Sequence, residues 1–333
     1  MFRTLTTLLM VFVAATAARG EDATRAAIAR GLKRVEASAA KYIENRACFS
    51  CHHQLVVPVL AAAKERGFPV DSWVLWSQTE FTRETFRPKL DRIRTGQGIA
   101  GANTMAAYAL FVLEAGGHES DETTAGLVQF LTNRQERDGS WPALADRPPT
   151  EGSPFTNAAL ALRGLRVYGL KDESLSADLR KRAQAARDAG RMWLTKHTPK
   201  TTEDKAFHLR ALVEADLPSD MVERARAALV AEQRPDGGWA QLADLPSDAY
   251  ATGIVLTALH RAGLPVSDPI YRKGVAYLLT TQNPDGGWRV TTRSRPVQTF
   301  FDNGDPGGKS QFISTAATHW ALLALLQTVE RGR

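Results

Sequence analysis

A seven-residue pattern that occurs three times along the chain constrains the fold most strongly. The copies run from Gln135 to Trp141, from Gln233 to Trp239 and from Gln282 to Trp288, each with Asp-Gly at its fourth and fifth positions. The second and third copies lie 49 residues apart, and the first and second lie 98 apart, which is twice that period. A fixed period of this length indicates one supersecondary unit stacked on itself. The sequence therefore predicts a repeat architecture, with a degenerate copy near Trp193.

Helical periodicity surrounds each copy of the pattern, and no segment shows the alternation of a strand. Small apolar residues dominate one set of helices, whereas the other set is more polar. The first set is expected to form an inner ring from residues 50–66, 102–116, 155–169, 203–215, 248–262 and 312–330. The second set is expected to form an outer ring from residues 22–45, 72–94, 120–134, 175–197, 219–232 and 268–281. Six such pairs predict an all-α (α/α)6 toroid, a single domain over residues 18–333.

The repeated pattern also carries a family resemblance. Its Gln-x5-Trp form with Asp-Gly-Gly turns, alternating with Ala-Leu-rich helices such as 251–259, resembles the α/α-toroid superfamily of squalene-hopene and other terpenoid cyclases and protein prenyltransferases. The resemblance covers about residues 100–330. It implies that the glutamine and tryptophan brace outer helices against neighbouring helix ends. Because that role is structural, the motif indicates the fold more strongly than the function.

The N-terminus and the charge pattern indicate where the protein acts. Residues 1–17 combine Arg3, a short uncharged apolar run and a small-residue ending, which is typical of a signal peptide. The run is shorter than the ~20 apolar residues that span a bilayer, and no later segment approaches that length. We expect an exported protein, periplasmic or secreted, without a membrane span. The formal net charge of +6 comes from scattered basic residues without interleaved aromatics, which disfavours nucleic-acid binding.

The sharpest chemical signal is the string from Cys48 to His52, which holds both cysteines of the chain and opens the first expected inner helix. In an exported protein, Cys-x-x-Cys-His is typical of a covalent c-type haem. Cys48 and Cys51 would form the thioethers and His52 would bind the iron, with His319 among the residues that could reach across as a second ligand. This pattern predicts haem c serving electron transfer or small-molecule redox chemistry with a redox partner.

Other chemistry fits the same string. A Cys48–Cys51 disulfide at a helix start needs no cofactor. Cys51 and Gln54 also share the Cys-x-x-Gln spacing of complement-type thioester domains, although the glycines and glutamate of that motif are missing. Zinc is the alternative cofactor, since it binds thiolate, imidazole and carboxylate ligands in tetrahedral sites. Its ligands would be Cys48, Cys51, His52 or His53, and Asp204 or Asp248.

Polar residues gather at the expected N-terminal ends of the inner helices. In a barrel of parallel inner helices these ends face one mouth, where their partial positive charge favours anions. A polar ring around an Ala-Leu-lined cavity predicts a ligand site, although Asn, Thr, Asp and Ser are also ordinary N-caps. The candidate catalytic residues are Glu203, Asp204, Asp248 and Tyr250. The other candidate pocket residues are His53, Gln54, Asn103, Asn157 and His319.

The resemblance also implies a test for cyclase chemistry. Squalene-type members protonate an alkene with an Asp-x-Asp-Asp cluster, and the matching stretch here reads Asp248-Ala249-Tyr250-Ala251. Only the first aspartate is present, and a phenol with a pKa of about 10 cannot replace the strong acid. The cysteine and histidine that bind zinc in the prenyltransferases are not recognisable either. The alternative to a haem protein is therefore a toroid that binds or transforms an apolar, isoprenoid-like ligand, or a structural protein-binding repeat.

Overall fold

The computed structural model describes residues 2–45, 49, 53–171, 175–295, 302, 305 and 307–332, with side chains from residue 21 to residue 44 in the first range. The long outer helices are α1 (Phe2–Asn45), α3 (Ser72–Phe86), α6 (Glu122–Arg134), α8 (Ala177–Lys196), α10 (Ser219–Ala231) and α12 (Pro269–Thr281). The inner helices are α2 (Val56–Glu65), α5 (Ala102–Ala115), α7 (Pro154–Gly164), α9 (Thr202–Glu214), α11 (Ala249–Arg261) and α13 (Gln311–Leu326). The short elements are η1 (Arg87–Lys89), α4 (Leu90–Ile93), η2 (Leu165–Leu170), η3 (Gly308–Ser310), β1 (Trp239–Ala240) and β2 (Ser247–Asp248).

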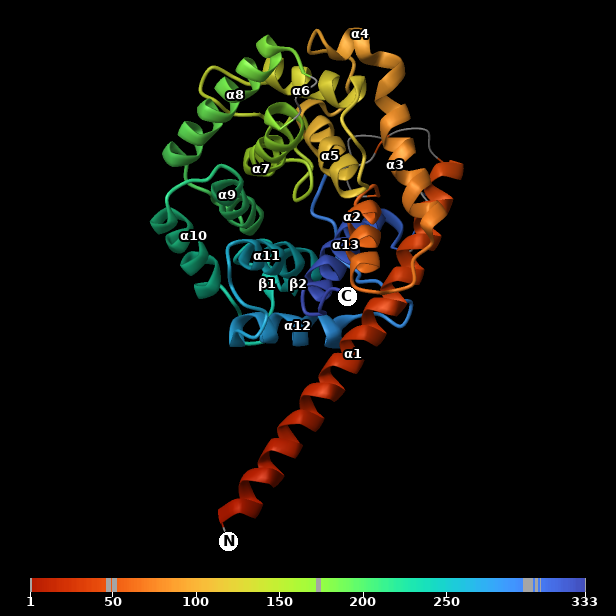
Figure 1. The fold of residues 1–333 in the computed structure, drawn as a ribbon, viewed down its shortest axis with the longest axis vertical. Coiled ribbons are helices and arrows are strands. Elements are labelled where there is room, and N and C mark those ends of the chain that lie inside the picture. Colours follow the sequence, from red (N-terminus) through yellow and green to blue (C-terminus); the bar gives the residue numbers. More distant parts are fainter. Residues whose placement is uncertain are drawn as a thin grey trace.

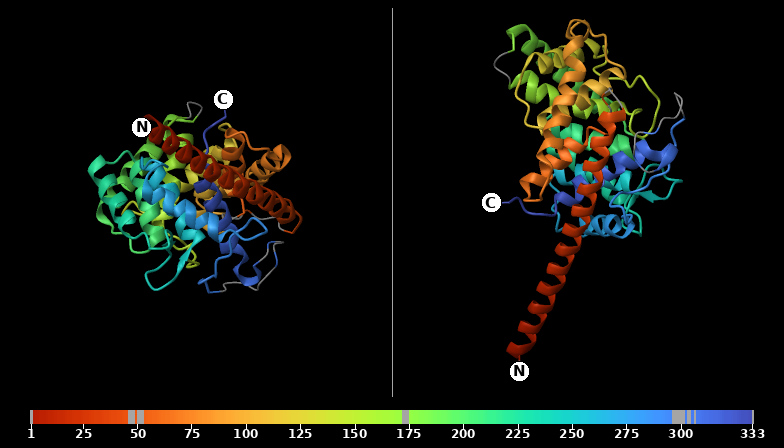
Figure 2. Two further views of the ribbon diagram at one scale, coloured as in Figure 1. Left: turned by 90° about the horizontal axis from the view of Figure 1, so that it is seen from below. Right: turned by 90° about the vertical axis from the view of Figure 1, so that its right-hand side faces the viewer.

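The inner helices form a closed ring. Contacts run from α2 to α5, α7, α9, α11 and α13 in turn, and α13 returns to α2 (Figure 1). The outer helices surround this ring, and the N-terminal part of α1 extends away from it (Figure 2). This arrangement confirms the predicted (α/α)6 toroid. Within the described ranges, no helix combines the length and the apolar character that a membrane span requires.

The inner helices are more deeply buried than the outer helices, as the sequence predicts. Helix α13 is buried along nearly its whole length, whereas Leu229 is the single fully buried residue in α10. A helix that is apolar on every side is stable only where other elements surround it. Each buried leucine contributes about 1.5–3 kcal/mol relative to an exposed one. The apolar inner helices therefore place the hydrophobic core inside the ring.

The three motif copies make the same contacts, and these contacts fasten the outer helices. Each tryptophan indole donates to a leucine carbonyl in the preceding outer helix, and each glutamine amide donates to a carbonyl in the next outer helix. The indole bonds are Trp141 to Leu131 (2.9 Å), Trp239 to Leu229 (2.8 Å) and Trp288 to Leu278 (2.9 Å). The amide bonds are Gln135 to Ala186 (2.8 Å), Gln233 to Ile270 (2.8 Å) and Gln282 to Ala27 (2.9 Å). The third copy thus links α12 to α1 and closes the outer ring.

The glycine at the fifth motif position is required for two reasons. Gly139, Gly237 and Gly286 have φ values of 93°, 86° and 86°, in the left-handed region that favours glycine. A Cβ at these positions would also lie 2.3, 2.5 and 2.4 Å from a backbone oxygen of the next outer helix. The turn therefore brings its backbone directly against that helix.

Several helix boundaries differ from the sequence prediction. The first inner helix begins at Val56 rather than residue 50, and the last ends at Leu326 rather than residue 330. The second outer helix divides into α3, η1 and α4 because Pro88 cannot donate a backbone hydrogen bond. Two-residue strands β1 and β2, which lack a detectable sequence period, pair in antiparallel fashion between α10 and α11.

The predicted degenerate copy near residue 190 does not form a motif turn. Trp193 lies within α8 and is buried between Phe155 and His197, with ring centroids at 4.8 and 4.6 Å. Its indole thus packs at the α8–α7 contact instead of following an outer helix. The degenerate copy therefore keeps the tryptophan without the turn, because α8 continues to Lys196.

Candidate functional site

The predicted haem string lies largely outside the described residues. Cys48, Cys51 and His52 all fall there, so haem c, zinc and the disulfide stay predictions. His53 and Gln54, the next residues of the chain, lie just before α2. Among the residues that the structure describes, no group of three His, Cys, Asp or Glu side chains is arranged to hold a metal ion.

His53 fixes the start of α2. Its Nε2 lies 2.8 Å from Asp305 Oδ2, and its ring stacks on Tyr42 with centroids 4.0 Å apart. Arg34 and Thr315 also donate to the Asp305 carboxylate, at 2.8 and 2.7 Å. Burial raises the pKa of Asp305, but the hydrogen bonds and charge of His53, with the bond from Thr315, hold it well below its usual range. The neighbouring Gln54 donates to Gln78 at 3.2 Å, a contact that joins the turn before α2 to α3.

The two asparagines predicted to line a pocket each bind a backbone carbonyl. Asn103 Nδ2 donates to the Pro142 carbonyl and Asn157 Nδ2 to the Trp141 carbonyl, both at 3.0 Å. The capping interpretation does not hold for Asn103 either, because the residue before α5 is a glycine. These amides hold the chain that follows the first motif turn against the inner ring.

The acidic pair at the start of α9 is bound to α7. Thr156 Oγ1 donates to Glu203 Oε1 at 2.7 Å, and Ser153 Oγ donates to Asp204 Oδ1 at the same distance. Asp204 also forms a capping box with Thr201. Burial raises the pKa of Glu203 to about 8, and the nearby Asp204 charge adds to this. Glu203 is therefore mostly protonated at pH 7.

Asp248 acts as the N-cap of α11. Its Oδ1 accepts from the Ala251 amide at 2.9 Å, and its Oδ2 accepts from Gln241 at 3.0 Å. Burial raises the pKa of Asp248, which its hydrogen bonds only partly offset. Arg293 donates to Gln241 Oε1 at 2.8 Å, and its charge lowers the pKa of both Asp248 and Glu203. The two carboxyls thus share one nearby cation.

These residues form a polar, buried N-terminal mouth, and the raised pKa values of Glu203 and Asp248 make these two carboxyls weaker acids than usual. Tyr250 and His319 are also buried inside the ring. A carboxyl whose pKa is raised gives up its proton less readily, which is the opposite of what alkene protonation requires. Glu203 and Asp248 are therefore suited to hydrogen bonding and helix capping rather than to starting a cyclisation.

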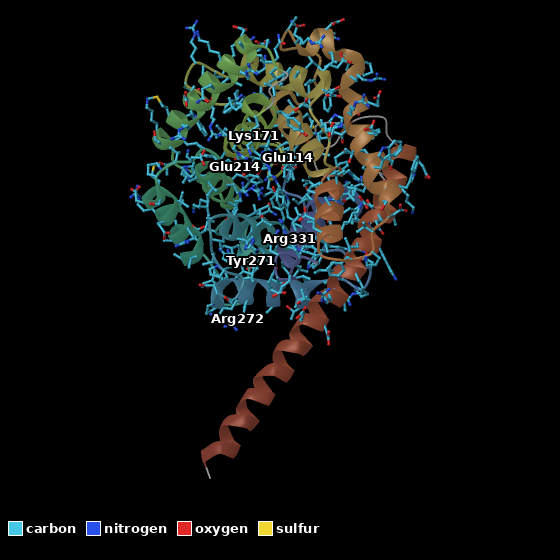
Figure 3. All side chains as sticks on the ribbon, viewed as in Figure 1. Glu114, Lys171, Glu214, Tyr271, Arg272 and Arg331 are labelled. Carbon is cyan, nitrogen blue, oxygen red and sulfur yellow. The ribbon has the colours of Figure 1, made fainter. Side chains whose placement is uncertain are left out.

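A cavity at the opposite mouth was missed by the sequence analysis. It has a volume of about 540 Å³ and is lined by side chains from all six inner helices, near their C-terminal ends. In Figure 3, the labels of Glu114, Glu214 and Arg331 lie around the middle of the ring. The apolar lining consists of Pro58, Ala61, Ala62, Phe111, Ala115, Trp320 and Leu323. The charged lining consists of Glu65, Arg66, Glu114, Arg163, Arg210, Arg261 and Arg331.

The sequence does carry a signal for this cavity. Arg163, Arg210 and Arg261 stand near the ends of three successive inner helices, with spacings close to the motif period. From spacing alone, they belong to the scattered basic residues of the chain. The signal is a charge that interrupts an otherwise Ala-Leu-rich helix, and all three of these arginines line the cavity.

Comparisons with known proteins agree with this fold. A family model for the squalene-hopene cyclase C-terminal domain matches residues 198–332. Drimenyl diphosphate synthase from Streptomyces showdoensis is 27% identical over 200 residues, which cover 60% of this chain and 28% of that protein. Squalene–hopene cyclase from Bradyrhizobium diazoefficiens is 36% identical over 123 residues, 37% of this chain and 17% of that protein. The chain therefore spans less than a third of the length of these relatives.

Solved structures extend the likeness to nearly the whole chain. A variant of the type II terpene cyclase MstE from Scytonema, bound to geranylgeranyl dihydroxybenzoate, superposes with a TM-score of 0.55 at 15% identity, covering 92% of this chain and 99% of that one. A glycosidase superposes with a TM-score of 0.56 at 11% identity, covering 91% and 98%. At these identities the likeness shows the fold alone. Together with the family match, it supports the α/α-toroid superfamily to which terpene cyclases belong.

Proposed function

We propose that this toroid binds a small apolar ligand of isoprenoid type in the cavity at the C-terminal mouth. The observation that carries the proposal is the joint lining of that cavity by all six inner helices. Its volume of about 540 Å³ lies within the range of about 300–1,000 Å³ that small-molecule sites occupy. Phe111, Trp320 and Leu323 supply an apolar wall suited to a hydrocarbon chain.

The comparisons support an isoprenoid ligand over other apolar molecules. The matching relatives include a squalene–hopene cyclase and a drimenyl diphosphate synthase, and the MstE structure contains a geranylgeranyl compound. The raised pKa values of Glu203 and Asp248 weigh against proton-initiated cyclisation. The proposal is therefore binding, with any transformation of the ligand left to chemistry other than squalene-type protonation.

Filling the cavity tests this proposal. Ala61 lines the cavity from α2 and is half-buried, so Ala61→Trp places a large side chain where the ligand would lie. We expect the wild-type protein to bind farnesol in isothermal titration calorimetry and Ala61→Trp to lose at least ~10-fold in affinity, which corresponds to about 1.4 kcal/mol.

Ala185→Trp provides the matched control, because Ala185 is exposed on the outer helix α8. The same added side chain there should leave farnesol binding unchanged. Equal affinity of the Ala61→Trp variant and the wild type would contradict binding in this cavity.

A further inference from the structure

We propose that the C-terminal mouth contains an oxyanion-binding site centred on Arg210, which takes the carboxylate or phosphate head group of the ligand. The inference rests on the proposed function for the apolar part of that ligand. The evidence for the site itself is the buried Arg210 cation and the charges around it.

Arg210 is a buried cation inside the ring. Arg210 is 8% exposed. Its guanidinium carbon lies 5.2 Å from the centroid of the Trp320 ring and 5.7 Å from the centroid of the Phe207 ring. Burial lowers the pKa of Arg210 to about 10, so the group stays charged at pH 7. Within the described ranges it forms no ion pair, and its hydrogen bond to Thr257 Oγ1 is long, at 3.4 Å. Two aromatic faces attract a cation but do not neutralise it.

The nearby carboxylates are already engaged by other arginines. Glu114 accepts two bonds from Arg163, at 2.5 and 3.1 Å. Glu214 pairs with Arg166 at 3.0 Å and with Arg261 at 2.9 Å. Burial raises the pKa of Glu214, but the surrounding arginines outweigh it and the pKa stays below its usual value. Neither carboxylate is thus left to pair directly with Arg210.

The lining as a whole carries excess positive charge. Five arginines and two glutamates line the cavity, which leaves a formal charge of +3. His260 adds no charge at pH 7, because burial lowers its pKa. A buried charge without a partner is strongly unfavourable, so an arrangement of this kind favours an anion. Guanidinium groups bind carboxylate and phosphate with particularly good geometry.

Capping of helix ends does not account for Arg210. The C-terminal ends of six inner helices carry partial negative charge that arginines can offset. Arg66 has this role, since it donates to the Ala62 carbonyl at 3.0 Å. Arg210 makes no such bond to a backbone carbonyl among the described contacts, and its guanidinium lies over the aromatic wall of the cavity instead. The charged and apolar linings therefore match one ligand with an acidic head and a hydrocarbon tail.

Three ligands with the same tail separate the head-group contribution from the apolar one. Farnesol, farnesoic acid and farnesyl phosphate are titrated calorimetrically into the full-length protein and into Arg210→Met. We expect the wild type to bind both anions more tightly than farnesol by about tenfold to a hundredfold, the usual range for hydrogen bonds to a charged group. The variant should lose that preference and keep its farnesol affinity. The tighter of the two anions identifies the head-group class.

The stability of the variant provides a second measurement. Removing an unpaired buried charge should leave the melting temperature of ligand-free Arg210→Met equal to or above that of the wild type, whereas a structural arginine would lower it. Arg272→Met is the matched control, because Arg272 is exposed on α12. It should change neither binding nor stability.

The outcomes distinguish the two levels of the proposal. Farnesol binding with no gain for the anions, or an Arg210→Met variant that keeps the anion preference or melts below the wild type, overturns the oxyanion site alone. Failure of all three ligands to bind the wild type overturns the proposed function as well.

Discussion

Gly286 lies in the motif turn that joins α12 to α1 and so closes the outer ring. Substituting this glycine measures how much the close contact contributes to the free energy of unfolding. Its φ of 86° costs an alanine about 1–2 kcal/mol. A Cβ there would also lie 2.4 Å from the Arg30 carbonyl oxygen of α1, and overpacking of this kind typically costs a further ~1–3 kcal/mol. We therefore expect Gly286→Ala to lower the free energy of unfolding by about 2–5 kcal/mol.

Gly263 supplies the matched control for this substitution. It has the same φ of 86°, but no residue that the structure describes lies within 4 Å of its added Cβ. Gly263→Ala should therefore cost only the backbone term of about 1–2 kcal/mol. Urea denaturation followed by circular dichroism gives both values. Equal losses for the two variants would refute the argument that the turn is pressed against α1.

Two further predictions concern Glu203 and the string from Cys48 to His52. Burial raises the pKa of Glu203 to about 8 from an ordinary value of 4.5, so ionisation disfavours the folded state increasingly as pH rises from 4.5 to 8. Glu203→Gln should therefore gain stability relative to the wild type across that window in pH-dependent melting curves, and a constant difference would contradict the assigned pKa. For the Cys48–His52 string, protein exported with haem c maturation machinery should give a pyridine haemochrome spectrum that Cys48→Ala abolishes. A colourless, folded and processed wild type would contradict the haem prediction.

Much of the fold follows from the sequence because the decisive contacts recur with the motif. Gln282 and Trp288 make the same bonds as their two earlier counterparts, so one spacing fixes three outer-helix junctions. The two departures from the predicted pattern depend on single residues. Pro88 interrupts the second outer helix, and Trp193 remains within α8 because no turn sequence ends that helix.

The site could be predicted less well. Periodicity placed Asn103 and Asn157 at inner-helix starts, but it could not show that their amides bind the backbone of residues 141 and 142. Arg210 was missed for a related reason, since spacing alone does not show whether a charged residue faces solvent or the ring interior. The distinction depends on the closed ring, where residues from helices far apart in sequence surround one cavity. The glycosidase and terpene cyclase neighbours show that this fold alone does not settle chemistry.

The most direct test of the account is a crystal structure of the protein with bound farnesoic acid. The account predicts the hydrocarbon chain against Phe111 and Trp320 at the C-terminal mouth, with the carboxylate within hydrogen-bond distance of the Arg210 guanidinium. A ligand found instead at the N-terminal mouth beside Glu203 and Asp248 would contradict both the location of the site and the role of its buried arginine.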